Sequence, residues 1–298
     1  METQLISFVI ATRNRKDSLN RCLTSIRSQS YPNKEILVID NGSDDGTSEF
    51  VRSAFAEVKL FSLPTNQGAA GGKSIGLREA QGQFIIQLDD DAAFPDTTVC
   101  ETVLLYFEHN KQVGVLNFNV LNPQTQQTQP RAIPRRDKRL LFADTYCGYF
   151  LGMGCAFRTD MLRQVGYYWE KLNPYGAEEF DLSYRILEAG HAILWTKEIR
   201  ICHFESPLSR PIGRRAYAET CNRIWVALRY LPWPYVFTHC VVWWSYGWLI
   251  ALRSSTMLDY AKGIRDCIAG MPDVYKKRKK ISPETIALLR RYCGPLYF

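Results

Sequence analysis

The first 120 residues of this chain alternate short apolar runs with segments of helical periodicity. Runs rich in Val, Ile, Leu and Phe occupy residues 6–12, 35–41, 58–63, 83–89 and 113–120. Between the first two runs, Leu19, Leu23 and Ile26 recur at the spacing of one buried helix face. This βαβ alternation predicts an α/β fold, in which helices flank a mixed, mostly parallel sheet. Ligands of such folds gather beyond the carboxyl ends of the strands.

The rest of the chain is expected in two parts. Up to Ser206 the patterns predict helices at residues 47–55, 70–80, 96–108 and 178–190, a strand at 152–158, extended pieces at 192–196 and 200–204, and a polar, Gln-rich loop at 122–139. Beyond it they predict helices near residues 213–229, 235–252, 256–269 and 283–293. We therefore expect a domain of residues 1–206 and a helical C-terminal region of residues 207–298.

The positive charge of the chain is concentrated in its last third. From residue 201 onward there are 15 Lys and Arg against 6 Asp and Glu, whereas the first 200 residues hold 22 against 24. The same third contains five of the seven tryptophans: Trp225, Trp233, Trp243, Trp244 and Trp248. Because indole rings favour the headgroup boundary and cations attract acidic lipid, the pattern favours a membrane surface. The alternative is a basic, partly buried helical subdomain. RNA-binding motifs are absent, so no nucleic-acid partner is expected.

One segment of that region, residues 230–252, contains no Asp, Glu, Lys or Arg. It is long enough in principle to cross a bilayer. Two prolines near its start and the Trp243–Trp244 pair at its centre favour a helix that lies in the membrane plane. A membrane span and an ordinary core or oligomer-interface helix are the alternatives.

Cysteine usage and the N-terminus indicate the compartment. The nine cysteines form no C-x-x-C arrangement, which favours free thiols in a reducing environment. The N-terminal METQLISFVIATRN lacks the basic-then-apolar layout of a secretory signal. We therefore expect a cytoplasmic protein held peripherally on the inner face of the membrane.

The stretch GAAGGKS at residues 68–74 looks like a phosphate-binding P-loop. That loop requires glycine, four residues and then Gly-Lys-Ser/Thr, so that backbone N–H groups wrap the phosphates. Gln67 stands where the first glycine is needed. The match fails at that position, so nucleotide hydrolysis is not predicted from it.

The strongest local signal is LDDDAAF at residues 88–94. Side chains alternate along a strand, so Asp89 and Asp91 should emerge on one side and Asp90 on the other. Adjacent carboxylates repel one another unless cations offset them, and a hard divalent ion with a diphosphate is the usual reason for such a cluster. An acidic turn or helix cap is the alternative.

Other polar residues also end strands. Asp40 closes EILVID and could bind a base or ribose, or simply form an Asx turn. Thr12, Asn14 and Arg15 follow the first strand and could line the same crevice, or cap the next helix.

A second acidic group and one histidine complete the set. Glu178, Glu179 and Asp181 begin a predicted helix, where the helix dipole favours acids, although a Glu beside a cleft also suits a general base. His203 follows a short strand and could complete a metal site, although an isolated His is more often structural.

Taken together, the chain resembles glycosyltransferase family 2, the inverting nucleotide-sugar transferases of the GT-A fold. The resemblance covers roughly residues 5–205 and consists of FVIATRNR, EILVIDNGSDDGT, NQGAAGGKSIGLREAQGQFIIQLDDD, GMGCAF, GAEEFDLSYRILEAGH and His203, in the order of the family.

The resemblance implies a role for each matching residue. It implies nucleotide or donor contacts for Thr12, Arg15, Asp40, Lys73, Asp89 and Asp90, metal ligation by Asp91, Asp89 and His203, and Glu179 as catalytic base. Glu179 stands where the family often has Asp, which leaves open whether Glu178, Glu179 or Asp181 takes the proton. Ser74 stands where many relatives have Asn.

The implied reaction is a single displacement at the anomeric carbon. Mg²⁺ or Mn²⁺ would offset negative charge on the diphosphate of the donor. UDP is the default nucleotide of the donor, and dTDP and GDP are the alternatives. The acceptor is expected to be a hydroxyl of a glycan or a polyprenyl-diphosphate-linked glycan, as in polysaccharide biosynthesis of the cell envelope. A sugar nucleotidyltransferase is one rival, although its glycine-rich loop is replaced here by ATRNRKDS. A non-catalytic membrane scaffold on the same fold is the other.

Overall fold

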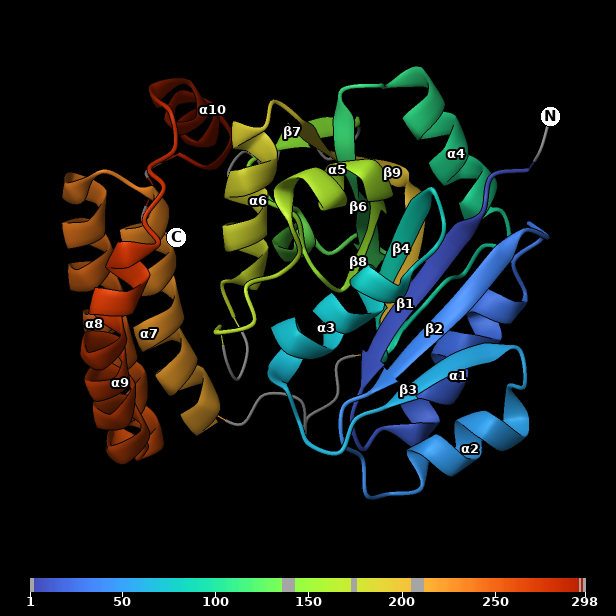
Figure 1. Ribbon diagram of the computed structural model, residues 1–298, viewed down its shortest axis with the longest axis horizontal. Helices are drawn as coiled ribbons and strands as arrows, with labels where there is room; N and C mark the ends of the chain where they lie inside the picture. Colours follow the sequence, from blue (N-terminus) through green and yellow to red (C-terminus); the bar gives the residue numbers. More distant parts are fainter. Residues whose placement is uncertain (1–2, 136–142, 173–175, 205–211, 295, 297–298) are drawn as a thin grey trace.

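The computed structural model describes residues 3–135, 143–172, 176–204, 212–294 and 296. Within these ranges, nine strands form one sheet with the order β3-β2-β1-β4-β8-β6-β9-β5, and β7 pairs with β9 (Figure 1). The strands are β1 Ile6–Thr12, β2 Lys34–Asp40, β3 Val58–Ser62, β4 Phe84–Asp89, β5 Ala92–Ala93, β6 Val113–Leu121, β7 Thr145–Cys147, β8 Gly154–Arg158 and β9 Ala192–His203. The helices are α1 Lys16–Arg27, α2 Thr47–Ala54, α3 Gly68–Glu79, α4 Val99–His109, α5 Thr159–Val165, α6 Glu178–Glu188, α7 Ile212–Tyr230, α8 Trp233–Ser254, α9 Met257–Lys276 and α10 Pro283–Cys293, with a 3₁₀ turn, η1, at Pro130–Ala132.

The sheet has a parallel and a mixed half. Strands β1, β2, β3 and β4 pair in parallel, so their carboxyl ends meet at one edge. Beyond them, β8 is antiparallel to both β4 and β6, and β9 then runs parallel to β6. This arrangement confirms the predicted α/β fold with a mixed sheet.

Helices cover both faces of the sheet. Because side chains alternate along a strand, Phe8 and Ile10 pack with α1, α2 and α4, whereas Val9 packs with α3, α5 and α6. Helix α3 approaches the sheet closely at Gly76, where an added Cβ would lie 2.4 Å from Cγ1 of Val9. At least this glycine of the GAAGGKSIG stretch therefore serves helix–sheet packing.

Most predicted elements are present within a few residues of their expected bounds. Residues 192–196 and 200–204, expected as separate pieces, belong to the single strand β9, with residue 204 just beyond its end. The short elements β5, β7 and α5 were not predicted. In the expected loop at 122–139, the described part contains only η1 and an isolated bridge between Leu121 and Thr128, while residues 136–142 lie outside the described ranges.

The C-terminal helices form a layer of their own. Helices α7, α8 and α9 pack side by side beyond α6, and α10 returns to β7 and α6 (Figure 1). The expected boundary at residues 206 and 207 lies outside the described ranges, so the division into two domains stays a prediction. Among the described residues, none of the helices is both long and apolar enough to cross a membrane.

Candidate active site

The polar strand ends meet at the carboxyl edge of the parallel half. The register places Thr12 beside Asp40 on β2, and Ala11 beside Asp89 on β4. The short strand β5 then pairs Ala92 with His203, which brings the end of β9 to the same edge. Residues from four distant parts of the sequence are thereby neighbours.

Of the three aspartates, only Asp89 belongs to β4, and Arg15 pairs with both of the others, Asp90 and Asp91, the latter at 3.2 Å. Asp90 accepts hydrogen bonds from Oγ1 of Thr12 and from a guanidinium nitrogen of Arg15, each at 2.7 Å. Asp91 has its Oδ1 3.0 Å from Nε2 of His203. Asp89 pairs with Nζ of Lys73 at 2.8 Å. Thr12 and Arg15 therefore lie at the predicted crevice, where they hold Asp90.

Asp89, Asp91 and His203 could hold a metal ion. Each offers one ligand atom, and the three atoms lie within 4.8 Å of one another. Carboxylate oxygens with an imidazole nitrogen suit Mg²⁺ less than Mn²⁺, which accepts both donor types. The chemistry of the donor set therefore fits the predicted divalent cation.

Burial and charge oppose each other around Asp90. Burial raises the pKa of Asp90 to about 6, since the stabilising effect of Arg15 is partly offset by the neighbouring carboxylate of Asp91. Burial also works against the charge of Arg15, but Asp90 and Asp91 raise its pKa above the ordinary value. The acidic cluster thus retains a firmly charged guanidinium at its side.

Lys73, the lysine of the P-loop-like stretch, lies in the second turn of α3 and is buried. Although burial opposes its charge, the carboxylates of Asp89, Glu179 and Glu178 raise its pKa. Its ammonium also lies 3.4 Å from the carbonyl oxygen of Gly152. The Lys73 side chain therefore extends from α3 into the acidic site. Lys73 belongs to a helix and not to a phosphate-binding loop. The neighbouring Ser74 donates to the carbonyl of Tyr168.

The first turn of α6 adds two more carboxylates. It follows Gly176 and Ala177, which have φ angles of 97° and 68°. Left-handed backbone at a residue other than glycine costs free energy and is often found at functional sites. Glu178 is buried, and its Oε2 has no hydrogen-bond partner in the described part of the chain. Burial, together with the charge of Glu179, raises the pKa of Glu178 to about 8.

Glu179 is half-buried, and its carboxylate and the ammonium of Lys73 both lie beside Gly152. A Cβ added to Gly152 would lie 2.7 Å from Oε1 of Glu179 and 3.0 Å from Nζ of Lys73. It would lie 3.3 Å from Nε2 of Gln87, which donates to the Gly152 carbonyl. The absence of a side chain at Gly152 thus lets three polar groups converge.

Asp181 has a different environment from the two glutamates. It is fully buried, pairs with Arg185 at 2.6 Å and with Arg229 at 3.1 Å, and accepts a hydrogen bond from the Tyr230 hydroxyl. Its carboxylate therefore ties α6 to the last turn of α7. Of the three acids that the sequence left open, Asp181 is the one engaged in structural ion pairs.

Asp40 forms the Asx-type turn that was one of its two interpretations. Its Oδ1 accepts from the backbone N–H of Ser43 at 2.9 Å, and its Oδ2 accepts from the Ser48 hydroxyl. Asn14, with a φ of 54°, exchanges hydrogen bonds with Asp44 at the same loop. A contact of Asp40 with a nucleotide stays a prediction.

Sequence reasoning missed Gln87 and Gly152. Gln87 is fully buried, and its side chain also accepts a hydrogen bond from the Tyr168 hydroxyl. A polar residue inside the apolar run FIIQL was the available signal. Gly152 opens the GMGCAF segment, but its proximity to Glu179 depends on contacts between distant segments.

A comparison with protein families identifies the family of the chain. The family described as "Glycosyl transferase family 2" matches residues 7–166, which is more than half of the chain. The chain belongs to glycosyl transferase family 2. This membership confirms the resemblance and the predicted class of enzyme, a glycosyltransferase. The matched range of family 2 includes Asp89 and Gly152, whereas Glu179 and His203 follow it.

Two curated relatives illustrate the similarity. An uncharacterized glycosyltransferase of Haemophilus influenzae is 42% identical over 94 residues, which cover 30% of this chain and 38% of that protein. The UDP-Glc:alpha-D-GlcNAc-diphosphoundecaprenol beta-1,3-glucosyltransferase WfgD of Escherichia coli is 26% identical over 123 residues, or 41% of this chain and 49% of that protein. The family 2 chain thus spans less than half the length of either relative.

A solved structure supports the fold. The mannosyltransferase PcManGT from Pyrobaculum calidifontis, in complex with GDP-Man and Mn²⁺, is superimposable with a TM-score of 0.58. The match covers 96% of this chain and 78% of that protein at 18% sequence identity. It confirms the GT-A fold predicted for this family 2 member.

Proposed function

We propose that this protein is a metal-dependent, inverting glycosyltransferase that moves a sugar from a nucleoside-diphosphate donor to a hydroxyl of a glycan or lipid-linked acceptor. The observation that carries the proposal is the joint placement of the Asp89, Asp91 and His203 cluster and of Glu179. Lys73 pairs with Asp89 of that cluster and, like Glu179, lies beside Gly152. A donor diphosphate and an acceptor hydroxyl require those two kinds of group at one site.

The cation would be Mg²⁺ or Mn²⁺, held by Asp89, Asp91 and His203. When bound, it would offset negative charge on the diphosphate leaving group. Lys73 and Arg15 supply further positive charge at the same edge. The Mn²⁺ in the PcManGT complex supports this choice by analogy of fold.

Glu179 would act as the general base. A base must reach the acceptor hydroxyl and be ionised near neutral pH. Glu179 is half-buried, and its Oε1 lies beside Gly152, close to the acidic cluster. Asp181 is engaged by two arginines, and Glu178 has a pKa raised to about 8, so each is a poorer candidate.

The donor would lie along the edge formed by Thr12, Arg15, Asp40, Lys73, Asp89 and Asp90. UDP is our default, in keeping with the UDP-Glc named for WfgD, and GDP and dTDP are the alternatives. The acceptor named for the same relative is linked to diphosphoundecaprenol. We therefore favour a lipid-linked acceptor at the inner face of the membrane.

Helix α8 supports a peripheral location at the membrane. Its outer face exposes Trp233, Phe237, Val241, Trp248 and Leu252 at spacings of four, four, seven and four residues, which place them on one side of the helix. Apolar and Trp-containing helix faces of this kind bind in the headgroup region.

A thermal-shift screen of UDP, GDP and dTDP with Mn²⁺, followed by a turnover assay with the responding sugar nucleotides, tests the proposal. A ligand that binds the folded state must raise its stability. We expect one nucleotide to raise Tm only when Mn²⁺ is present. We also expect the sugar of the matching donor to be transferred to an acceptor hydroxyl, with release of the nucleoside diphosphate. Stabilisation without turnover on any acceptor would favour a non-catalytic scaffold, and pyrophosphate release from a nucleoside triphosphate would favour a nucleotidyltransferase.

A further inference from the structure

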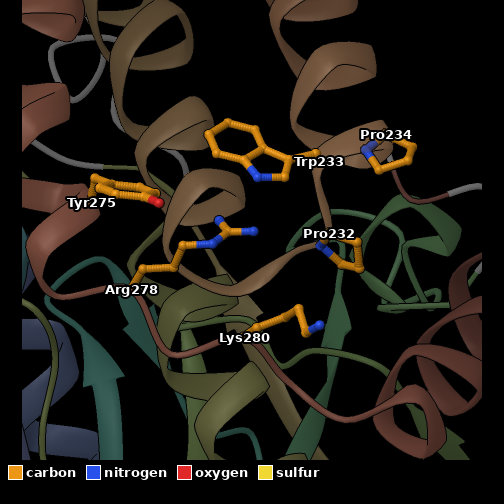
Figure 2. Close-up of a pocket in the computed structure, with 6 residues that line it drawn as sticks. All are labelled: Pro232, Trp233, Pro234, Tyr275, Arg278 and Lys280. Atoms are coloured by element: carbon orange, nitrogen blue, oxygen red, sulfur yellow. The ribbon is translucent and has the colours of Figure 1, made fainter.

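A pocket lies in the helical layer, at the turn between α7 and α8. Pro232, Trp233, Pro234, Tyr275, Arg278 and Lys280 line it, and its volume is about 690 Å³ (Figure 2). All six residues come from this turn and from the end of α9 and the residues that follow it. The pocket is therefore separate from the carboxyl edge of the sheet.

Its walls are aromatic and held in place. The ring centroids of Trp233 and Tyr275 are 6.1 Å apart at 31°, and both side chains are about half exposed. The Arg278 guanidinium lies 5.1 Å from the centroid of the Trp233 ring (Figure 2). It also donates to the carbonyls of Leu228 and Leu231 at the end of α7. The hydrogen bonds of Arg278 thus stabilise the α7–α8 turn.

Lys280 is the second cationic side chain of the pocket, and it can pair with a ligand. Its side chain is exposed, and within the described ranges it has no hydrogen bond or ion pair with another residue. It ends a run of five cations, residues 276–280. The carboxylate of Asp273 lies 3.8 Å from Nζ of Lys276 and 3.9 Å from Nζ of Lys171. The charge of this pocket therefore suits an anionic ligand.

The position of the pocket indicates the source of that anion. Trp233 is both a wall of the pocket and the first residue of the exposed apolar face of α8. At a membrane surface, apolar side chains enter the acyl boundary, Trp and Tyr rings lie at the level of the headgroups, and Lys pairs with lipid phosphates. Here Trp233, Tyr275 and Lys280 line one pocket, and the apolar face of α8 begins at Trp233, so the three kinds of side chain adjoin one another.

We propose that this pocket binds the phosphate headgroup of an anionic phospholipid. Lys280 pairs with the phosphate, and the Trp233 and Tyr275 rings pack against the glycerol region. The proposal rests on the membrane location proposed above and adds a defined lipid site to it.

Vesicle binding of the full chain tests this site. The protein is titrated with phosphatidylcholine vesicles that contain or lack 30 mol% phosphatidylglycerol, a composition chosen as roughly that of an acidic membrane surface. The variants are Lys280→Gln and the matched control Lys277→Gln, which removes an equal charge from the same run but outside the pocket. We expect Lys280→Gln to weaken binding to the anionic vesicles about fivefold, the ratio that corresponds to one basic residue at such a surface. Lys277→Gln should have a clearly smaller effect.

Three outcomes would overturn the proposal, and a fourth would separate it from the proposed reaction. Equal effects of the two variants would indicate diffuse attraction by the basic run without a site. Binding of soluble glycerol phosphate that depends on Lys280, read from tryptophan fluorescence, in a protein that shows no preference for the anionic vesicles would indicate a free phosphate ester as the ligand. Absence of vesicle binding by the wild type would remove both this site and the membrane location, whereas sugar transfer to a soluble acceptor would still support the proposed reaction. Conversely, vesicle binding that depends on Lys280, in a protein without transfer activity, would support the lipid site and contradict the proposed reaction.

Discussion

The ammonium of Lys73 lies 2.8 Å from Oδ1 of Asp89, so a residue of α3 is joined to the acidic end of β4. Both side chains are largely buried, and burial makes the pair interdependent. Removing one partner leaves an uncompensated charge in a region that water reaches poorly. This contact gives the P-loop-like stretch a role in the architecture of the site.

We expect Lys73→Met to lower the free energy of unfolding by about 3 kcal/mol, measured by urea denaturation without ligand. The control is Lys171→Met, which breaks the ion pair with Asp273 at 3.9 Å, in which both side chains are more than half exposed. Exposed pairs contribute no more than about 1 kcal/mol. Equal losses in the two variants would show that the Lys73–Asp89 pair is not a buried pair in solution.

The assignment of the base is tested by Glu179→Gln. This variant cannot accept the proton of the acceptor, so the transfer rate should fall by about 10² to 10⁴ while donor binding persists. Glu178→Gln is the matched control, because an amide resembles the protonated acid that a pKa of about 8 implies at neutral pH. It should retain most of the activity. The reverse result would move the role of base to Glu178.

Glu178 should also make the stability of the fold depend on pH. Its pKa is raised to about 8 in the folded protein, so between the ordinary value of a Glu and about pH 8 the folded state holds a proton that the unfolded state has lost. Stability should therefore fall as pH rises through that window and then level off. In Glu178→Gln this contribution is absent. The variant should gain stability relative to the wild type as pH rises from 5 to 8, measured by urea denaturation at each pH.

A parallel pH series with Glu198→Gln provides the control. Glu198 lies on the exposed part of β9, and removing it changes the net charge by the same amount. A stability difference from the wild type that is equally pH-dependent in both variants would refute the assignment to Glu178.

Much of the fold could be predicted from the sequence because its signals are local. Apolar runs marked the parallel strands. Alternation was expected to separate Asp90 from Asp89 and Asp91, but β4 ends at Asp89, and Arg15 pairs with both Asp90 and Asp91. The predicted metal cluster is assembled in the structure.

The convergence around Gly152 could not be predicted, because it depends on pairing between distant segments. Strand β8 lies antiparallel between β4 and β6, and this insertion carries Gly152 to Gln87 and Lys73. The two-residue strand β5, which joins Asp91 to His203, is too short to give a periodic signal. The ion pairs of Asp181 with Arg229 depend on how α7 packs on α6.

The metal cluster predicts a specific loss in Asp91→Asn. This change keeps the shape of the side chain but removes its charge, which a hard cation requires. We expect Mn²⁺ to raise the Tm of the wild type in the presence of the preferred nucleotide, and to have no such effect on the variant. Asp160→Asn, at an exposed position on α5, is the control and should respond as the wild type does. A full Mn²⁺ response in Asp91→Asn would exclude Asp91 as a ligand.

Gly152→Ala and Gly154→Ala should separate a defect of the site from a defect of the core. The Cβ of Gly152→Ala would meet the side-chain ends of Glu179 and Lys73, which would have to shift. A displacement of about 1 Å at a catalytic group can cost about 10²-fold in rate, so we expect a large loss of activity with a smaller loss of stability than in Gly154→Ala. In Gly154→Ala the Cβ would lie 2.3 Å from Cδ1 of the buried Ile201, and overpacking should lower the free energy of unfolding by about 1–3 kcal/mol. If Gly152→Ala retained full activity, the position of Glu179 beside Gly152 would not matter for transfer, and the base would have to be sought elsewhere.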